Sequence, residues 1–575
     1  MMTATESHGC PSDSSRNVLH SDDAPELWVW QVVAGGSAAL HQRQPNQDVI
    51  MIITKAPQHC SHTTTRPNKL RNTEQAKASL EKRLAASTLV NSWPALIVAG
   101  LVLLITVIIY RRHFSPLKDI PGPFWASFSR LWHIRITLDG NQNEQLTQAH
   151  EKYGHFVRLA SNEVSVSHPD AIRRVLLAPL KKGDMYKMST FPDWRYQNPM
   201  SIVDPKRKVE LSKQFASGYT LTNALKSEEA MDGLVARLLE WMDKSAASQE
   251  PMELDRYVTF LTFDLLGEVL FSKPFGYVAA GEDIGGSIAT NLRLVGTHAV
   301  ASHFRAVQLA ALNPLTSRLL PWGHLFNTAF RALAERRASP DARFDVVAHW
   351  LRTAAEHPDR LTERDILANA TANVGAGSDT VSCAAQSFLY HMTRRPELWR
   401  RARDEIRASQ GADGSCRSRV IQYNDAVKLP FFQACLKEAL RIHNPVPMGL
   451  PRVAPKGGLR IGETTLPEGT TVSVSPWVIH HSKEIFGPDA LEFNPDRWLG
   501  PDASRLDKYW CPFGAGYMSC PGQNFAKMEL SKTLATIVRD YDLRLVDPAR
   551  SWKWKAWFTM VPYDWPVYVR KSTLS

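Results

Sequence analysis

Residues 510–526, near the C-terminal end of the chain, read WCPFGAGYMSCPGQNFA and place one cysteine, Cys520, between a glycine-rich turn and the start of an expected helix. Backbone N–H groups and the positive end of a helix dipole stabilise a thiolate at such a position. A sulfur held in this way can act as a nucleophile or as a metal ligand. This stretch alone leaves both roles open, so the rest of the chain has to decide between them.

Composition narrows the class of protein. The chain has 575 residues, of which 44% are hydrophobic, so it can form one large domain or a few ordinary ones. Its seven cysteines lack the spacing of a disulfide framework or a zinc site, which favours a reducing compartment. The net charge of +11 suits an acidic partner or an anionic membrane surface. No basic tract is interleaved with aromatics, so nucleic-acid binding is not expected.

An uncharged interval runs from Leu84 to Tyr110 and ends in ALIVAGLVLLITVIIY. About 20 apolar residues cross a hydrocarbon layer roughly 30 Å thick. The interval therefore predicts a transmembrane helix over residues 89–110 rather than a buried core helix. A cleaved signal peptide is not expected, because the run begins far from the N-terminus and lacks a small-residue cleavage site. Basic residues lie on both sides of the interval, so their count does not fix the orientation.

The segments around this helix differ in character. Residues 1–83 are polar and lack sustained periodicity, which predicts a disordered extension. Residues 111–124 include SPLKDIPGPF, whose prolines prevent a continuous helix and predict a stiff hinge. A globular domain is expected over residues 125–575.

Helical periodicity dominates this domain from about residue 140 to 445. Strand-like runs occur at residues 155–168 and 459–477, and in the second the alternation and the PEG sequence predict a hairpin. The chain contains no G-x-G-x-x-G after a strand and no G-K-[ST] loop, so a dinucleotide or ATP site of the common kinds is not expected. The pattern predicts a mainly α body with a small β part.

The sequence AGSDT, which ends at Thr380, lies inside a long apolar helix-like run. Gly375 and Gly377 each cost a helix about 1 kcal/mol relative to alanine, so they require a reason. Close approach of a flat ligand, with a local opening of the helix, is one reason. Asp379 and Thr380 would then place an acid and a hydroxyl beside that ligand. The alternative is a helix N-cap formed by Ser378 and Asp379.

Glu438 and Arg441 in EALR are three residues apart and share one helix face. Arg497 in FNPDRW could complete a buried trio with them, because a buried charge requires a partner. The alternative for the EALR pair is an ordinary solvated ion pair.

The stretch FGAGYMSCPG resembles a known family motif. It is similar to the ligand loop F-G-x-G-x-R-x-C-x-G-x-x-x-A-x-x-E of the cytochrome P450 family, the haem-thiolate monooxygenases. Every fixed position agrees except one, where Met518 replaces the usual arginine. The resemblance covers roughly residues 115–575 and is closest to fungal microsomal members of the pisatin demethylase and benzoate hydroxylase type. It implies the P450 fold, a large helical domain with small β-sheets, preceded here by the transmembrane helix.

The resemblance also implies haem b as the cofactor, with the Cys520 thiolate as the axial ligand of the iron. Phe513 would shield the sulfur, and Gly514 and Gly522 would let the backbone turn under the porphyrin. A nucleophilic cysteine is not expected, because no motif supplies a histidine base.

Met518 removes a cation that the family places near a haem propionate. By resemblance, Arg452 in GLPR would reach a propionate, and Lys213 in DPKRKVELSKQF would replace an arginine on an early helix. The alternatives are a strand-edge charge for Arg452 and a solvated helix face for Lys213.

The implied activity is insertion of one oxygen atom from O2 into a lipophilic small molecule, with thiolate ligation favouring O–O cleavage. Thr380 would steady the oxygen and Asp379 would connect it to solvent. The segments 372–376, 446–450 and 557–562 are expected to face the substrate and are mostly apolar. The alternatives are a haem-thiolate isomerase or dehydratase, which AGSDT disfavours, and a non-catalytic haem-binding protein.

The chain shows no flavin or nicotinamide module, so the resemblance implies an external electron donor. NADPH-cytochrome P450 reductase is the expected partner, with cytochrome b5 as a second candidate. The expected location is the endoplasmic reticulum membrane, with a single span and a cytoplasmic catalytic domain. The fungal resemblance further implies a role in secondary metabolite biosynthesis.

Overall fold

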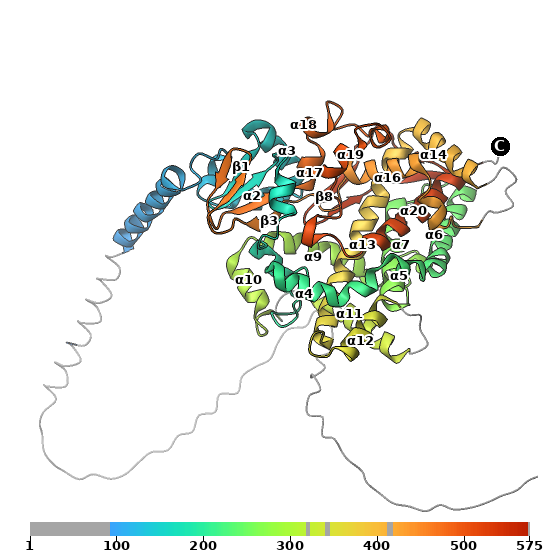
Figure 1. Ribbon diagram of the computed structural model, residues 1–575, viewed down its shortest axis with the longest axis horizontal. Helices are drawn as coiled ribbons and strands as arrows, with labels where there is room; N and C mark the ends of the chain where they lie inside the picture. The colour runs from blue at the N-terminus through green and yellow to red at the C-terminus, as the bar shows by residue number, and fades with distance from the viewer. Residues whose placement is uncertain (1–76, 78–92, 318–322, 340–344, 411–417, 573–575) are drawn as a thin grey trace, which may run out of the picture. The chain divides into compact units, whose positions relative to one another are not determined.

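The computed structural model describes residues 77, 93–317, 323–339, 345–410 and 418–572 (Figure 1). Apart from Lys77, the predicted disordered extension over residues 1–83 lies outside these residues, as do the first residues of the predicted transmembrane helix, 89–92.

Helices make up most of the described chain. Before the central helix they are α2 Leu131–Asp139, α3 Gln142–Tyr153, α4 Pro205–Phe215, α5 Leu221–Leu225, α6 Glu228–Ser248, α7 Leu254–Phe271, α8 Tyr277–Ala280, α9 Ser287–Ala301, α10 Arg305–Leu312, α11 Gly323–Ala338 and α12 Val346–Glu356. From the central helix onward they are α13 Glu363–Thr393, α14 Pro396–Ser409, α15 Tyr423–Ala426, α16 Pro430–Ile442, α17 Pro476–His480, α18 Lys483–Phe486, α19 Ala503–Leu506 and α20 Gln523–Asp540.

The strands are short and fall into two sections of the sequence, residues 156–166 and 450–571. They are β1 Phe156–Ala160, β2 Glu163–Val166, β3 Leu450–Val453, β4 Leu459–Ile461, β5 Thr464–Leu466, β6 Thr471–Val474, β7 Tyr541–Leu545, β8 Lys553–Ala556, β9 Met560–Tyr563 and β10 Val567–Lys571. The mainly α fold with small sheets agrees with the prediction.

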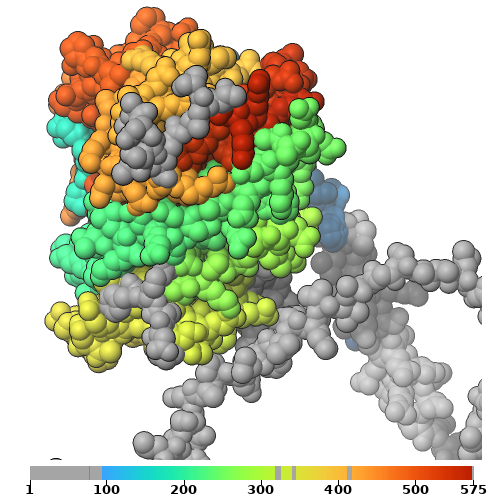
Figure 2. All heavy atoms as spheres, turned by 90° about the vertical axis from the view of Figure 1, so that its right-hand side faces the viewer, coloured from blue at the N-terminus to red at the C-terminus, as the bar shows by residue number. Residues whose placement is uncertain are grey.

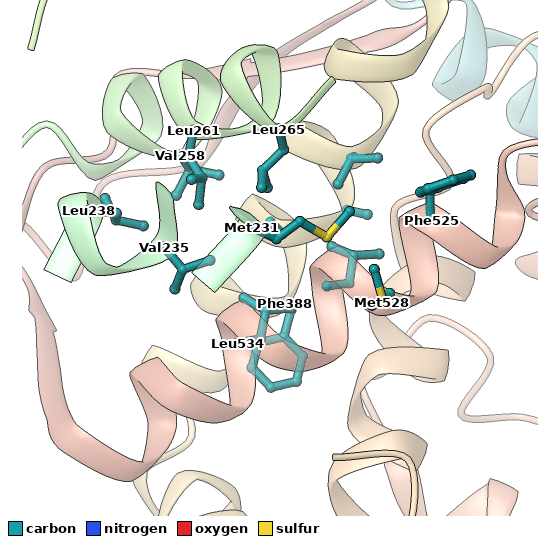
Figure 3. Packing of buried hydrophobic residues seen from close by; sticks show 14 of the residues in the cluster. Met231, Val235, Leu238, Val258, Leu261, Leu265, Phe388, Phe525, Met528 and Leu534 are labelled. Atoms are coloured by element: carbon teal, nitrogen blue, oxygen red, sulfur yellow. The ribbon is translucent and has the colours of Figure 1, made fainter. Parts of the chain in front are cut away.

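The long helix α13 organises the core and lies centrally in Figure 1. Its start is fixed by a capping box, in which Thr362 and Asp365 satisfy each other's backbone N–H groups. It packs on α7, α11, α16 and α20. Figure 3 shows apolar side chains of α6, α7, α13 and α20 meeting in one cluster, including Met231, Leu261 and Phe388. Burial of such side chains stabilises each by about 1.5–3 kcal/mol.

One four-stranded sheet has the order β1-β2-β6-β3, with β2 and β6 parallel and the other pairs antiparallel. The strand prediction for residues 155–168 is confirmed by β1 and β2. The predicted hairpin at 459–477 is partly wrong. The hairpin is β4–β5, which turns at Gly462, whereas the PEG sequence leads from β5 to β6 in a different sheet.

The predicted trio of charges is buried. Both carboxylate oxygens of Glu438 accept from the Arg441 guanidinium at 2.8 and 2.9 Å, and Arg497 Nε donates to Oε1 at 3.1 Å. Glu438 and Arg441 are 0% exposed. Trp498 Nε1 and the Asn494 N–H also donate to this carboxylate at 2.9 Å. The trio joins α16 to the segment that follows α18, so it holds two distant parts of the chain together.

The apolar helix that could cross a membrane spans Trp93–Phe114; an 18-residue window within it has a mean hydropathy of 2.5 and no buried side chains. It runs four residues further than the predicted span, and its last turn, Tyr110–Phe114, is π-helical. The extended backbone at Ser115 ends it, so the non-helical connection begins there rather than at residue 111.

The C-terminal strands pack against helices from an earlier part of the chain. In Figure 2 the red C-terminal segment lies against the green helices, where β10 packs on α6. Met252 and Val567 exchange backbone hydrogen bonds at 2.8 and 3.0 Å.

Candidate active site

The loop before α20 holds Cys520 by its backbone. The Cys520 N–H donates to the Phe513 carbonyl at 2.8 Å, which closes the loop. Gly514 has φ of +70°, and a Cβ on it would lie 2.8 Å from the Met518 carbonyl oxygen. Only glycine fits both conditions. Gly522 is the N-cap of α20, so Cys520 lies just before the helix start as the sequence predicts.

The sulfur is not prepared as a nucleophile. Burial raises the pKa of the Cys520 thiol, and the Gly522 N–H lowers it only in part. Within the described part of the chain, no histidine hydrogen-bonds to this sulfur. A thiol without an activating base remains protonated, whereas a metal ion can displace its proton. The environment of Cys520 therefore suits a metal ligand.

Phe513 lies beside the sulfur loop, where the sequence placed it as a shield. Its ring packs edge-on against Trp510 at 6.0 Å between centroids, and the Lys527 ammonium lies 5.5 Å from the ring centre. These contacts fix the Phe513 ring just before the turn at Gly514.

Three buried cations gather around Tyr517, three residues before the cysteine. Lys182, Lys208 and Arg452 are 0%, 9% and 1% exposed. Lys208 Nζ donates to the Tyr517 carbonyl, and the Arg452 guanidinium lies 5.7 Å from the centre of the Tyr517 ring. Lys182 lies next to Arg452, because the backbones of the two residues form an antiparallel β-bridge. We call these three residues the cation cluster.

The cation cluster has no counter-charge among the described residues. Lys182 Nζ donates only to backbone carbonyls, at 2.6 and 3.1 Å, and none of the three side chains forms an ion pair within the described ranges. Arg452 Nε is buried with no hydrogen-bond partner. Burial, together with Arg452 and Lys208, lowers the pKa of Lys182 to about 6. Buried charges normally have partners, so this arrangement requires an anionic ligand.

The sequence predicted part of this cluster. Arg452 lies in it, on strand β3, but Lys213 is exposed on α4 and the structure does not bring it to the cluster. Lys208 lies there instead, on the same helix. Lys208 and Phe215 are seven residues apart and both buried, so the helical period points to Lys208 as the inward residue. Lys182 carries no comparable sequence signal.

Met518 is half-buried beside this cluster, where an arginine was expected from the resemblance. Its side chain contributes no charge, but the three cations supply positive charge next to the same turn. The residues present therefore fit a thiolate-ligated group that bears carboxylates.

Helix α13 is continuous through AGSDT, so the expected opening of the helix does not occur and Ser378 and Asp379 are not N-caps. A Cβ on Gly377 would lie 2.5 Å from Leu266 Cδ1 of α7. The Leu266 side chain of α7 therefore packs closely on α13 at Gly377, and a larger residue there would require the end of this side chain to shift.

Asp379 and Thr380 lie next to each other on α13 with different surroundings. Asp379 is buried, and Asn291 Nδ2 of α9 donates to its Oδ2 at 3.1 Å. Burial raises the pKa of Asp379 to about 7. Thr380 is half-buried, and its hydroxyl donates to the Ala376 carbonyl at 3.0 Å. Ala376 is exposed, so this face of α13 is not covered by protein. Sequence reasoning did not find Asn291.

Tyr219 connects the two halves of the site. Its hydroxyl donates to Asn373 Oδ1 of α13 at 3.0 Å, and its carbonyl accepts from Asn524 Nδ2 of α20 at 2.9 Å. Burial raises the pKa of Tyr219, and a thiolate at Cys520 would raise it further. The cysteine loop and the AGSDT helix are therefore tied together by one residue.

The loop and the turn that were predicted to face a substrate are neighbours. The Met560 N–H donates to the Pro445 carbonyl at 2.9 Å, which places the 557–562 turn next to the 446–450 loop. Trp557 packs against Gly296 of α9, so closely that a Cβ added to Gly296 would lie 3.2 Å from the Trp557 ring. The 557–562 segment therefore contacts both the loop and α9.

A buried cysteine before a helix, a cluster of cations near it and an acid next to a hydroxyl on the central helix fit a haem-thiolate oxidoreductase. The cytochrome P450 family model matches residues 120–563. The chain is 30% identical to a pisatin demethylase of Fusarium vanettenii over 87% of this chain and 97% of the relative. It is also 30% identical to the cytochrome P450 monooxygenase asR2 of Sarocladium schorii over 78% and 91%, and 29% identical to gsfF of Penicillium aethiopicum over 79% and 94%.

The chain belongs to the cytochrome P450 family and is a cytochrome P450 monooxygenase. Its cofactor is haem with an axial cysteine thiolate. The predictions of the family, the enzyme class and the cofactor are confirmed.

Proposed function

We propose that this protein is a membrane-anchored monooxygenase that oxidises a lipophilic small molecule with electrons from NADPH. The single observation that carries the proposal is the pair on α13. Asp379 is buried with a pKa of about 7, next to a Thr380 hydroxyl on the uncovered face of the helix. A carboxyl group with such a pKa can give and regain a proton near neutral pH.

Cys520 would ligate the iron, and the cation cluster would bind the haem propionates. When bound, the haem supplies oxygen activation. Arg452 and Lys208 would pair with the propionates. Lys182, whose pKa of about 6 leaves it mostly neutral near pH 7, would gain its proton beside these carboxylates. Phe513 would cover the sulfur, and Gly514 and Gly522 would allow the turn beneath the ring. Met518 leaves the usual arginine position uncharged.

Asp379 and Thr380 would move protons to the reacting oxygen. The Thr380 hydroxyl lies on the open face of α13, and Asp379 lies one residue earlier, buried against α9. Asn291 would orient the Asp379 carboxyl group through its amide N–H. This arrangement supports a relay that runs from solvent through Asp379 to Thr380.

The substrate would be apolar. The 446–450 loop and the 557–562 turn next to α9 are mostly hydrophobic, which suits a small molecule that partitions into a membrane. One relative is named for demethylation of pisatin, so oxidation of a fungal secondary metabolite is the reaction class that we propose. The helix Trp93–Phe114 would anchor the enzyme in the endoplasmic reticulum with its catalytic domain in the cytoplasm. NADPH-cytochrome P450 reductase, assisted by cytochrome b5, would be the electron donor.

Coupling of NADPH consumption to product formation tests the relay. The Thr380→Ala variant, reconstituted with reductase and a converted substrate, should consume NADPH while it forms much less product per NADPH. The Thr371→Ala variant is the matched control, since this threonine is buried on the same helix and likewise donates to a carbonyl one turn earlier. Equal coupling in Thr380→Ala and the parent would exclude the role of Thr380.

A further inference from the structure

A cavity of about 270 Å3 lies where the apolar helix Trp93–Phe114 meets the globular domain. Its wall includes Arg112 and His113 from the last turn of that helix, Lys118 from the connection and Arg158 from strand β1. Ser127 and the proline-rich segment 121–123 complete much of the remaining wall. The cavity is therefore built from the anchor, the connection and the domain together.

The wall carries positive charge without a counter-charge. No aspartate or glutamate lines this cavity, and within the described ranges none of its cationic side chains forms an ion pair. Arg158 is 2% exposed and donates only to neutral oxygens, including the carbonyls of Arg111 and Leu117 and the Ser115 hydroxyl. Burial and the charges of Arg112 and Arg111 lower the pKa of Arg158. An anion in the cavity would relieve this repulsion.

The position of the cavity indicates the source of that anion. The apolar helix ends at Phe114, so Arg112 and His113 lie at the level of the lipid headgroups if the helix spans a bilayer. Phe114, Phe124 and Trp125 are all more than half exposed around it, as aromatic residues at a membrane interface are. Arg112 stacks on Phe124 at 4.8 Å and donates to Ser127 Oγ at 3.4 Å, which holds its guanidinium at the cavity.

We propose that this cavity binds the phosphate headgroup of an anionic phospholipid, which fixes the catalytic domain relative to the membrane surface. The inference rests on the proposed membrane anchoring. The headgroup phosphate pairs with Arg112 and Arg158, and Lys118 lies at the exposed rim. A zwitterionic lipid fits less well, because its ammonium group meets the same positive charges.

Calorimetric titration of the full-length protein in an uncharged detergent tests the proposal. The probes are dihexanoyl phosphatidic acid, dihexanoyl phosphatidylcholine and inorganic phosphate. Phosphatidic acid should bind about tenfold more tightly than phosphatidylcholine, because its phosphate meets the cations of the cavity without an accompanying ammonium group. Arg112→Gln should reduce this preference to about twofold, because one of the two cations that pair with the phosphate is lost. Arg135→Gln is the matched control and should retain it, because Arg135 is an exposed arginine of α2 that pairs with Asp139.

Arg112→Gln is preferred to a change at Arg158, which holds the connection through several hydrogen bonds and could unfold it. Equal affinities for the two lipids, or an unchanged preference in Arg112→Gln, would overturn the proposal. Inorganic phosphate that binds as tightly as phosphatidic acid would overturn it too, because the ligand would then be a soluble ion. Alkaline extraction from phosphatidylcholine vesicles tests the anchor separately: a chain that stays in the vesicles but shows no lipid preference keeps the anchor and loses the headgroup site.

Discussion

Two groups of buried arginines and lysines in this protein differ in whether their positive charges have acidic partners. In the trio on α16, Arg441 and Arg497 share the Glu438 carboxylate, and further donors satisfy the remaining oxygen lone pairs. In the cation cluster, Lys182, Lys208 and Arg452 have only neutral partners among the described residues. Both groups are desolvated, yet only the first is balanced. A balanced group serves the fold, whereas an unbalanced one indicates a bound anion.

Removal of Glu438 should be the most damaging change. Glu438→Gln leaves the buried Arg441 guanidinium without a counter-charge and removes one of the two carboxylate partners of Arg497, which keeps Asp489. Breaking such a buried network costs about 3–5 kcal/mol. Denaturant unfolding of the apo-protein measures the loss. Asp425→Asn is the control, because its pair with Lys428 is exposed and is worth less than about 1 kcal/mol. A loss below about 1 kcal/mol for Glu438→Gln would mean that the trio is not a structural network.

Asp379 extends the comparison to a buried acid whose hydrogen-bond partner is a neutral amide, Asn291. Asp379→Asn should lower turnover about 10²-fold, because the group can no longer exchange a proton. Product formation per unit of enzyme with reductase and NADPH measures this. Turnover within about twofold of the parent would exclude the role of Asp379.

Asp379→Asn should also change how the stability of the protein depends on pH. The ordinary pKa of an aspartate is 3.8, and burial raises that of Asp379 to about 7. The native state keeps this proton between those values while the unfolded state loses it, so Asp379 destabilises the protein as pH rises through that window. The Tm of Asp379→Asn relative to the parent should therefore rise between these two pH values. A constant difference would show that the pKa is not raised.

Substitution of Arg452 distinguishes a buried cation that binds a ligand from one that stabilises the fold, because the first affects haem affinity and the second affects the stability of the apo-protein. Arg452→Met should weaken haem binding about 10–100-fold, as loss of a supporting residue does. The apo-protein should unfold at the same or a higher denaturant concentration, because a buried cation without a carboxylate has been removed. Haem titration and apo-protein unfolding measure the two effects. Arg460→Met, at an exposed arginine, is the control. A destabilised apo-protein with unchanged haem affinity would make Arg452 a structural residue.

The smallest expected effect compares two lysines of α4. Lys208→Met should weaken haem binding severalfold, by about 1 kcal/mol, since it removes one charge-assisted contact. Lys213→Met should change haem affinity and stability by less than about 0.5 kcal/mol, because its side chain is exposed. Haem titration of both variants checks this order. The reverse order would restore Lys213 as the propionate ligand.

Features that depend on local sequence were predictable. The turn at Gly514, the position of Cys520 before α20 and the pairing of Glu438 with Arg441 all follow from residues close together in the chain. The mainly α fold followed in the same way from helical periodicity.

Features that depend on tertiary packing were not predictable. The side chain that packs on Gly377 is Leu266 of another helix, and the partner of Asp379 is Asn291 on α9. Lys182 becomes part of the site only because its loop meets strand β3, with the Lys182–Arg452 bridge joining them. In each case the decisive neighbour is distant in sequence, and no local pattern records it.

The most direct test of the account is the spectrum of the reduced protein with carbon monoxide. The purified parent, loaded with haem, should give the red-shifted ferrous carbonyl band of thiolate ligation, and Cys520→Ser should lose that band while it keeps the fold. The Cys511→Ser variant, at a buried thiol in the same segment, should keep the band. A band that persists in Cys520→Ser, or that is absent from the parent, would contradict the assignment of Cys520 as the haem ligand.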